Sequence, residues 1–592
     1  MGTPGQRARR RLPAALAVLA VAAAVHVNAS KAPASAVPAH PDDRTIIHVL
    51  NRIGFGPRPG DIERVRAIGL QAYIDRQLRP EKVDDPAIAA RLASLETLHK
   101  SSREIAEQYL LPAQMLRLQQ RQQQAAPAPA IAPVADLPPA ASPAGPRPQA
   151  APVTDGQPRE MRTPEQIEAA KVERAVMTDL AQQKVLRAVY SERQLDEVMV
   201  DFWFNHFNVF AGKGQTRGYV TEYERETIRP HVLGKFRDLL GATAQSPAML
   251  FFLDNWQSSA PPDAETSMPA RNGRADALFA PVRPGGGRTP ATARRPIAPE
   301  PAPRVGPAVQ NRRDRGVNEN YARELMELHT LGVDGGYTQK DVQEVARALT
   351  GWTIQNPRLG GGFVFQPRMH DAGAKLVLGH TIKAGGGQQD GEQVLDILAR
   401  HPSTARFIST KLVRRFVSDT PPKTLVDRAA KRFHDTDGDI REVVRTIITS
   451  PEFFSASAYR AKVKTPFEFV VSALRATGTD APSALPFVAA LRDLGMPSYM
   501  CQPPTGYADR ADAWVNTGAL LARMNFAVTL TAPRRPRGNP AIPADPGQAR
   551  DTLVSDVLGG DLSPSTQSII AQAQQAPQAV ALVLGSPEFQ KR

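Results

Sequence analysis

Apolar side chains recur at helical spacing over most of this chain. In eight segments, residues three, four and seven positions apart are apolar and polar residues lie between them, as on an amphipathic helix. We therefore expect helices at 61–77, 164–189, 192–203, 221–240, 402–417, 439–448, 466–476 and 517–530. The pattern predicts a mainly α fold, built as one large multi-helix domain.

A strand pattern occurs in only one region. Residues 362–365 and 376–381 alternate or run apolar on either side of a glycine-containing stretch at 370–373. This arrangement predicts a minor β-hairpin near 362–382. One helical domain carrying this hairpin is the simplest architecture, and two helical lobes divided near residue 258 are the alternative.

Two segments have neither helical nor strand period. Residues 125–164 and 258–315 are dominated by Pro, Ala, Gly, Ser and Arg, a composition that cannot bury enough apolar surface to fold. We predict two disordered low-complexity inserts. They divide the chain into helical parts, and a proline-rich stretch at 532–547 precedes a helical tail; the boundaries are 44–124, 165–257, 316–531 and 549–592.

The N-terminus has the order of an export signal. Four arginines lie between positions 7 and 11, an apolar run follows at 12–27, and small residues come next at 28–30. The alternative is a membrane anchor, but the run is shorter than the roughly 20 residues that span a bilayer. We expect a signal peptide at 1–29, an exported protein that is periplasmic or extracellular, and no transmembrane span after signal removal.

The formal charge of +14 does not indicate a nucleic-acid partner. The signal contributes four arginines and no acid, and the stretch 256–315 holds ten arginines against five acids, so these two segments carry most of the excess. No basic patch interleaved with aromatic residues accompanies them. A basic loop of this kind favours contact with an anionic polysaccharide. The single cysteine, Cys501, cannot form an internal disulfide.

Ionisable residues are most crowded at 318–352, which holds six carboxylates, a histidine and two arginines. Helical spacing places Asn320, Glu324 and Glu327 on one face and His329 on the apolar side. Glycines at 332, 335 and 336 then end the helix, and Thr338 with Asp341 predicts the cap of the next helix. The segment is either a functional site or a rigid structural corner.

A second candidate is an aromatic run at 202–207 that contains Trp203, Asn205 and His206. Burial would keep the histidine neutral and available as a base, and the rings could form a surface on which a sugar stacks. The structural alternative is a core cluster in which the histidine only bonds to the backbone.

A third candidate is the pair His370 and Asp371, followed by Lys375. On a turn, the carboxylate could orient the imidazole and raise its basicity. The alternative is an Asx-turn in which Asp371 bonds to its own backbone before Gly373.

Two arginines are candidate ligand-binding residues, Arg347 and Arg406. Arg406 shares a helix with Lys411 and Arg414, and this row is either a solvated face or a source of an ion pair with Glu324. No metal site is predicted, because the aspartates at 435–439 do not match a calcium loop, in which glycine occupies the sixth position.

Several blocks together resemble the bacterial family known as Domain of Unknown Function 1800. They are HVLNRIGFGPRPGDIERV near Asn51, DFWFNHFNVF at Trp203, the segment at 318–352, HDAGAKLVLG at His370, HPSTARFISTKLVRRFV at Arg406 and KTPFEFVVSALRATG at Pro466. The likeness extends from Thr45 to about Phe526. It implies a mostly helical, exported protein whose partner belongs to a second family, Domain of Unknown Function 1501, and it implies no particular activity.

Two functional classes follow. In the first, an exported enzyme or binding protein acts on a polysaccharide or another envelope polymer, with Glu324, Glu327, His370, Asp371 and His206 as acid and base groups. In the second, the protein is a non-catalytic helical scaffold. The residues name no reaction, substrate or cofactor.

Overall fold

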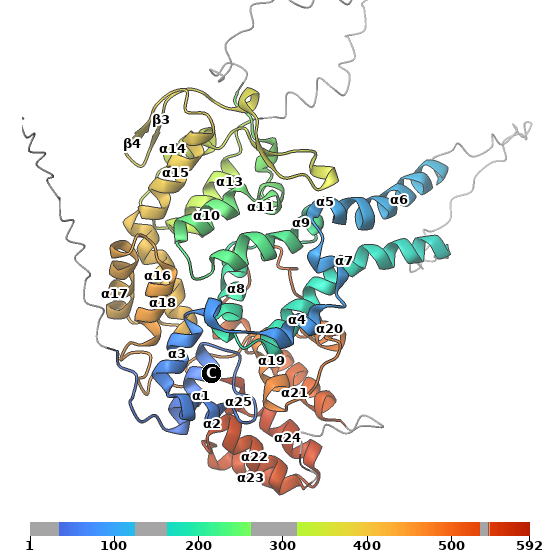
Figure 1. Ribbon diagram of the computed structural model, residues 1–592, viewed down its shortest axis with the longest axis vertical. Coiled ribbons are helices and arrows are strands. Elements are labelled where there is room, and N and C mark those ends of the chain that lie inside the picture. Colours follow the sequence, from blue (N-terminus) through green and yellow to red (C-terminus); the bar gives the residue numbers. More distant parts are fainter. Residues whose placement is uncertain (1–34, 125–162, 262–315, 533–542, 544) are drawn as a thin grey trace, which may run out of the picture. The chain divides into compact units, whose positions relative to one another are not determined.

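The computed structural model describes residues 35–124, 163–261, 316–532, 543 and 545–592. Helices dominate these ranges, which confirms the mainly α fold class (Figure 1). The predicted signal peptide and most of the two predicted inserts lie outside the described residues. None of the helices in the described ranges combines the length and apolarity needed to cross a bilayer.

The N-terminal helices are short because glycine and proline interrupt them. The expected helix at 61–77 is two helices, since Gly69 adopts a φ of 85° between them, a conformation that glycine tolerates best. The elements are α1 (Asp43–Arg52), α2 (Asp61–Ile68), α3 (Leu70–Gln77), η1 (Pro80–Lys82), α4 (Pro86–Leu92), η2 (Glu96–His99), α5 (Ser102–Ile105), η3 (Ala106–Leu110) and α6 (Leu111–Gln124).

The next region contains the longest helix, α7, which begins at a capping box formed by Thr163 and Gln166. The expected helix at 221–240 is not continuous, because Pro230 lacks an amide hydrogen and the chain turns before α10 begins. The elements are α7 (Pro164–Tyr190), α8 (Gln194–His206), α9 (Thr216–Glu222), η4 (Tyr223–Ile228), η5 (Arg229–His231), α10 (Phe236–Gln245), α11 (Pro247–Phe252) and η6 (Asn255–Gln257).

The acidic segment forms α13 (Glu319–Glu324), a wider π-helical turn η7 (Leu325–Thr330) and α14 (Gln339–Ala348). The predicted cap is confirmed, because Thr338 and Asp341 form a reciprocal capping box. The predicted hairpin is wrong in its pairing: β1 (Trp352–Ile354) pairs with β2 (Phe363–Phe365), and β3 (Lys375–Val377) pairs with β4 (His380–Ile382). Short helices η8 (Pro357–Leu359) and η9 (Pro367–Met369) lie between them.

From residue 388 on, the regular elements among the described residues are helices joined by loops, with boundaries close to those expected at 402–417, 439–448, 466–476 and 517–530. The elements are α15 (Gln388–Arg400), α16 (Pro402–Phe416), α17 (Lys423–Asp435), α18 (Ile440–Ile448), α19 (Pro466–Ala476), α20 (Leu485–Asp493), η10 (Ala511–Ala513), α21 (Thr517–Thr531), α22 (Pro546–Leu558), α23 (Pro564–Ala571), α24 (Ala576–Gly585) and α25 (Pro587–Gln590).

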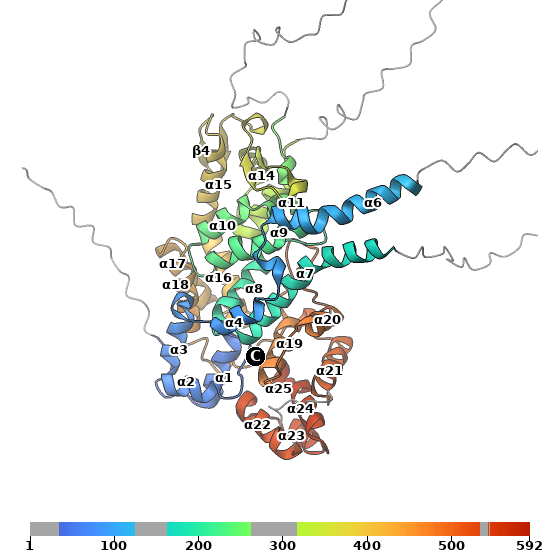
Figure 2. The ribbon, with the colours of Figure 1, turned by 45° about the vertical axis from the view of Figure 1, so that its right-hand side comes forward.

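One hydrophobic core cluster contains side chains from both sides of the undescribed stretch at 262–315, among them Trp203, Trp352 and Phe469. The last residues add to the body, because Val463 pairs with Lys591 in an antiparallel bridge. Outside the core, α6 lies beside the N-terminal half of α7, as both Figure 1 and Figure 2 show, and an ion pair at 2.5 Å joins Arg117 to Glu173 there.

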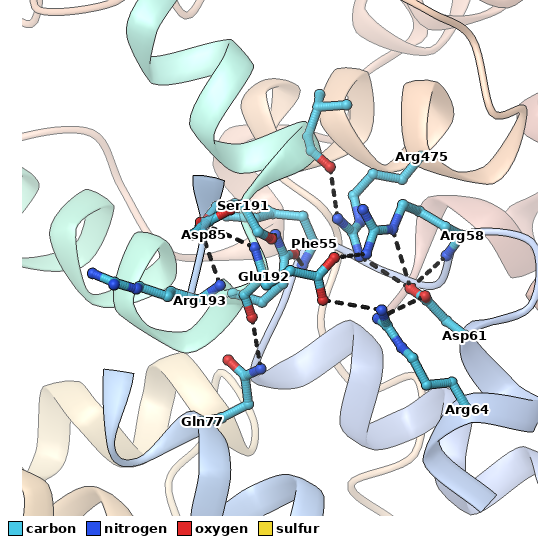
Figure 3. A network of polar contacts seen from close by, with 12 residues as sticks. Phe55, Arg58, Asp61, Arg64, Gln77, Asp85, Ser191, Glu192, Arg193 and Arg475 are labelled. Carbon is cyan, nitrogen blue, oxygen red and sulfur yellow. Dashed lines mark hydrogen bonds and ion pairs between the residues drawn. The ribbon is translucent and has the colours of Figure 1, made fainter. Parts of the chain in front are cut away.

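A polar network joins three regions that are far apart in the sequence (Figure 3). Asp61 on α2 is bonded to Arg64 at 2.9 Å and to Arg475 of α19 at 3.2 Å. Arg475 also donates to the backbone carbonyls of Gly56 and Val189, both at 2.7 Å. The network thus fixes α2, the end of α7 and α19 against one another.

Candidate functional site

The aromatic run at the end of α8 is buried. Trp203 is fully enclosed, its indole N–H donates to the carbonyl of Val232 at 3.0 Å, and its ring lies 5.4 Å from that of His206. The structure therefore places Trp203 in the core, where its faces contact protein side chains.

His206 is also buried, but both of its ring nitrogens have partners. Nε2 lies 3.1 Å from the carbonyl oxygen of His329, and Nδ1 lies 2.8 Å from Nζ of Lys411. A carbonyl can only accept, so Nε2 carries the hydrogen and Nδ1 accepts from the lysine. Burial, with Lys411 and His329 nearby, lowers the pKa of His206 well below its usual value, which agrees with a neutral ring.

His329 belongs to the π-helical turn η7. Its carbonyl lies at the end of this helical segment, where orphan acceptors need donors from elsewhere, and His206 supplies one. Burial and Lys411 lower the pKa of His329 to about 3. His329 lies on the buried side of the segment, while Glu324 and Glu327 are half-buried, as the helical spacing predicts.

Lys411 on α16 is half-buried and holds its amine against His206 (Figure 1 shows α8 and α16). Burial lowers the pKa of Lys411 to about 8, and the charge of Arg414 acts in the same direction. Neither Lys411 nor Arg414 forms an ion pair with any described carboxylate. The nearby Asp509 is bonded to Lys462 at 2.8 Å.

This geometry gives two chemical capabilities. An amine with a pKa near 8 is partly neutral under physiological conditions, so it can remove a proton as a general base. Two neighbouring cations without an acidic partner can bind a carboxylate. His206 holds the amine in place through the lone pair of Nδ1, and is thus a positioning residue.

The sequence left Lys411 and Arg414 either on a solvated face or in an ion pair with Glu324, and neither alternative included the contact between Lys411 and His206. Lys411 lies one turn after Phe407, and its amine is 5.4 Å from the centre of that ring. Helical spacing places the lysine beside the apolar stripe. It contains no information about a histidine 205 positions away.

Among the described residues, no hydrogen bond or ion pair joins Glu324 or Glu327 to either candidate histidine. Glu327 forms an ion pair with Arg323 at 3.3 Å, and Asn320 is exposed. Glu324 forms no ion pair with any described cation. Burial, followed by repulsion from Glu327, raises its pKa.

His370 is fully buried, and its carboxylate partner is not Asp371. Nδ1 lies 2.8 Å from the carbonyl of Thr350, and Nε2 lies 3.1 Å from Asp390. Lys375 is buried beside them and donates to Asp390 at 2.7 Å. Burial opposes ionisation of Asp390, but hydrogen bonds from His370 and Lys375 outweigh it and lower the pKa of this carboxyl.

Asp371 forms the Asx-turn that was the structural alternative, because it accepts from the N–H of Gly373 at 2.9 Å. It also accepts two bonds from Arg347, at 2.8 and 3.1 Å, and Arg347 bonds to Glu344 as well. Arg406 pairs with Asp427 at 2.7 Å on the surface. Neither arginine pairs with Glu324.

The side chain of Asn205 is occupied by the backbone of Tyr507, which it meets at 2.8 and 2.7 Å. Both residues line a small pocket with Lys184 and Asp201, which form an ion pair at 2.6 Å. The amide therefore holds the 499–507 loop against α8.

Across the described ranges, no three potential metal ligands of the His, Cys, Asp and Glu types gather in one place. Asp439 caps α18 by accepting from the N–H of Glu442 at 3.2 Å. Cys501 is buried, and burial raises its pKa to about 11, so it is a poor nucleophile.

Comparison with protein families identifies the chain. The model described as "Protein of unknown function (DUF1800)" matches residues 48–591. The protein belongs to this family. The match includes the C-terminal tail, which the sequence resemblance had left out. No curated protein and no solved structure matches the chain.

Proposed function

We propose that this DUF1800 protein is exported and binds a carboxylated envelope polysaccharide at Lys411 and Arg414, where Lys411 acts as a general base. The observation that carries the proposal is the amine of Lys411, which is half-buried, lacks an ion pair with any described carboxylate, has a pKa lowered to about 8, and is held by His206. Arg414 would bind the sugar carboxylate.

The chemistry that fits this pair is proton removal next to a carboxylate. The neutral amine of Lys411 takes the proton from the carbon that bears the carboxylate, and the electron pair forms a carbon–carbon double bond. The glycosidic oxygen on the next carbon then leaves and takes up, as an alcohol, the proton that the Lys411 ammonium returns. The chain is cleaved without water, and Arg414 neutralises charge that develops on the carboxylate.

The test uses the full chain with two acidic polysaccharides, polygalacturonate and alginate. The conjugated product absorbs ultraviolet light, and affinity for an oligouronate is measured by calorimetry. Lys411→Arg should retain affinity within about threefold and lose at least about 100-fold in turnover, because it keeps the charge but not the base. Arg414→Gln should weaken binding by about 10- to 100-fold.

Lys431→Met is the matched control, because Lys431 is exposed on α17 and pairs with Asp435. It should leave both measurements unchanged. For the parent protein, the rate at low substrate should rise with pH through about 8 as Lys411 loses its proton. A parent protein that neither binds nor cleaves either polymer contradicts the proposal.

A helical scaffold is the second candidate, because the other candidate residues form ion pairs and hydrogen bonds within the protein. His370, Lys375 and Asp390 form one buried set, and Asp371 with Arg347 forms another. In this case the partner would be a protein of the Domain of Unknown Function 1501 family. Co-purification of such a protein with the parent and equally with Lys411→Met would favour the scaffold.

A further inference from the structure

A pocket lies between α20 and α21, two helices that are side by side in both Figure 1 and Figure 2. Its volume is about 340 Å³, and it opens to solvent. Pockets that bind small molecules usually occupy roughly 300 to 1,000 Å³, so this space is large enough for a ligand. It shares no lining residue with the site at Lys411 and Arg414.

The wall of this pocket is mainly apolar. The larger apolar side chains that line it are Phe487, Leu494, Phe526 and Leu530. Both helices also contribute small residues to the lining, namely Ala489 and Ala490 from α20 and Ala522 from α21. The space therefore exists because alanines stand where larger apolar side chains would fill the gap between the two helices.

Each helix is anchored to the rest of the fold independently of the other. Gln182 of α7 accepts from the backbone N–H of Ala484, the N-cap of α20, at 3.2 Å. Arg523 of α21 is buried and donates to Gln590 at 2.7 Å and to the carbonyl of Lys464 at 2.8 Å. Closing the gap would disturb these bonds, so the pocket is preformed and a ligand needs to order little of the protein.

Charge is sparse around the pocket. Among the described residues that line it, only Asp493 is charged, and this exposed carboxylate pairs with Arg492 at 3.3 Å. The hydroxyl of Thr529 donates to the backbone of Asn525 at 2.8 Å, which leaves the side-chain amide of Asn525 as a lining group without a hydrogen-bond partner among the described residues. A ligand carboxylate would lose water here without meeting a cation, which is costly.

We propose that the pocket between α20 and α21 binds an uncharged, mainly apolar small molecule with one hydroxyl or amide group that contacts Asn525. A cavity of about 150 Å³ with apolar walls holds one benzene molecule, so this larger space has room for two fused rings or an alkyl chain of similar size. A peptide helix does not fit, because it is about 10 Å across and one turn rises about 5.4 Å, which requires more than the available volume.

The experiment is calorimetry on the full chain with two probes built on the same rings. Naphthol carries one hydroxyl and is neutral at neutral pH, whereas naphthoate carries a carboxylate. The parent should bind one naphthol per chain, and naphthoate should bind at least about tenfold more weakly. Asn525→Ala should weaken naphthol binding by about two- to tenfold, because the hydroxyl loses its partner.

Two variants of α21 separate binding in the pocket from adhesion to the surface. Ala522→Leu places a larger side chain in the space, so it should weaken naphthol binding by at least about tenfold while the protein stays as stable as the parent. Val528→Ser is the matched control, since Val528 is 53% exposed and does not line the pocket. It should leave the affinity for naphthol unchanged.

A parent protein that does not bind naphthol overturns the proposal, as does equal affinity of the parent and Ala522→Leu. Equal affinity of the parent for naphthol and naphthoate overturns the assignment to an uncharged ligand. If Ala522→Leu does not fold, Ala490→Leu fills the space from α20 and provides the same test. Sedimentation supplies the last outcome: a parent dimer that becomes a monomer in either filled variant would assign the pocket to a second copy of the chain and overturn the proposal.

Discussion

Arg475 on α19 and Lys411 on α16 are both cations where helices meet, and the structure surrounds them differently. Arg475 is almost fully buried. Its guanidinium donates hydrogen bonds to two backbone carbonyls, both at 2.7 Å, and to Asp61 at 3.2 Å. Lys411 is half-buried, and among the described residues its amine has one hydrogen-bond partner, the lone pair of His206 Nδ1. The first arrangement is complete within the protein, whereas the second retains capacity to bind a ligand.

This contrast distinguishes structural charge from candidate functional charge. In Figure 3, Arg58 and Arg64 reach both Asp61 and Glu192, so each acid is shared and each cation is matched. No described acid matches Lys411 or Arg414. Removing a group should therefore destabilise the fold in the first region and affect mainly ligand binding in the second.

The largest effect is expected for Asp61→Asn. This change leaves the buried guanidinium of Arg475 without its carboxylate, and an uncompensated buried charge costs about 3 to 5 kcal/mol in the free energy of unfolding. Denaturant unfolding of the purified variant beside the parent measures it. Burial already lowers the pKa of Arg475 to about 10 with Asp61 present.

Asp43→Asn is the control for this prediction. Asp43 pairs with Arg66 on the surface of the same region, and both side chains are about half exposed. An exposed ion pair contributes less than about 1 kcal/mol. If Asp61→Asn lowers the free energy of unfolding no more than Asp43→Asn does, a full set of hydrogen-bond and ion-pair partners does not identify the charges that stabilise this fold.

A smaller effect of opposite sign is expected for Lys411→Met. The folded pKa of about 8 is below the usual 10.5, so charged Lys411 destabilises the fold below pH 8. This cost fades as the pH rises from about 8 to 10.5. The variant should therefore gain stability relative to the parent near neutral pH, and the gain should shrink over that window.

Loss of the hydrogen bond to His206 lowers the stability of Lys411→Met, but this loss does not vary with pH over the window in which the lysine titrates. The slope of the difference against pH is therefore the informative quantity. Lys431→Met, on the exposed face of α17, should show no slope. A flat difference for Lys411→Met would mean that this amine is not strained by burial.

The helices were predictable because their signals are local. Apolar spacing and caps such as Thr338 with Asp341 lie within a few residues of each other. The pairing of the hairpin was not predictable from the sequence. Strands of three residues are too short for the alternation of apolar and polar residues to determine which strands pair, and Phe363–Phe365 pairs with Trp352–Ile354 instead. The same limit applies to the site: the sequence singled out His206, but its contact with Lys411 is set only by how α8 packs on α16.

The smallest effect is expected for Glu324→Gln. The structure gives Glu324 no ion pair with any described cation, and Arg347 and Arg406 pair elsewhere. The free energy of unfolding should therefore change by less than about 1 kcal/mol.

The pH dependence of Glu324→Gln gives the sign of this change. The folded pKa of Glu324 is raised above 4.5 by burial and by Glu327, so its ionised form destabilises the fold at neutral pH. The variant should be level with the parent below pH 4.5 and slightly more stable above it. Unfolding measured across this range decides the question. A loss of several kcal/mol at neutral pH would show that Glu324 is a structural charge like Asp61, and would remove it from the candidate functional residues.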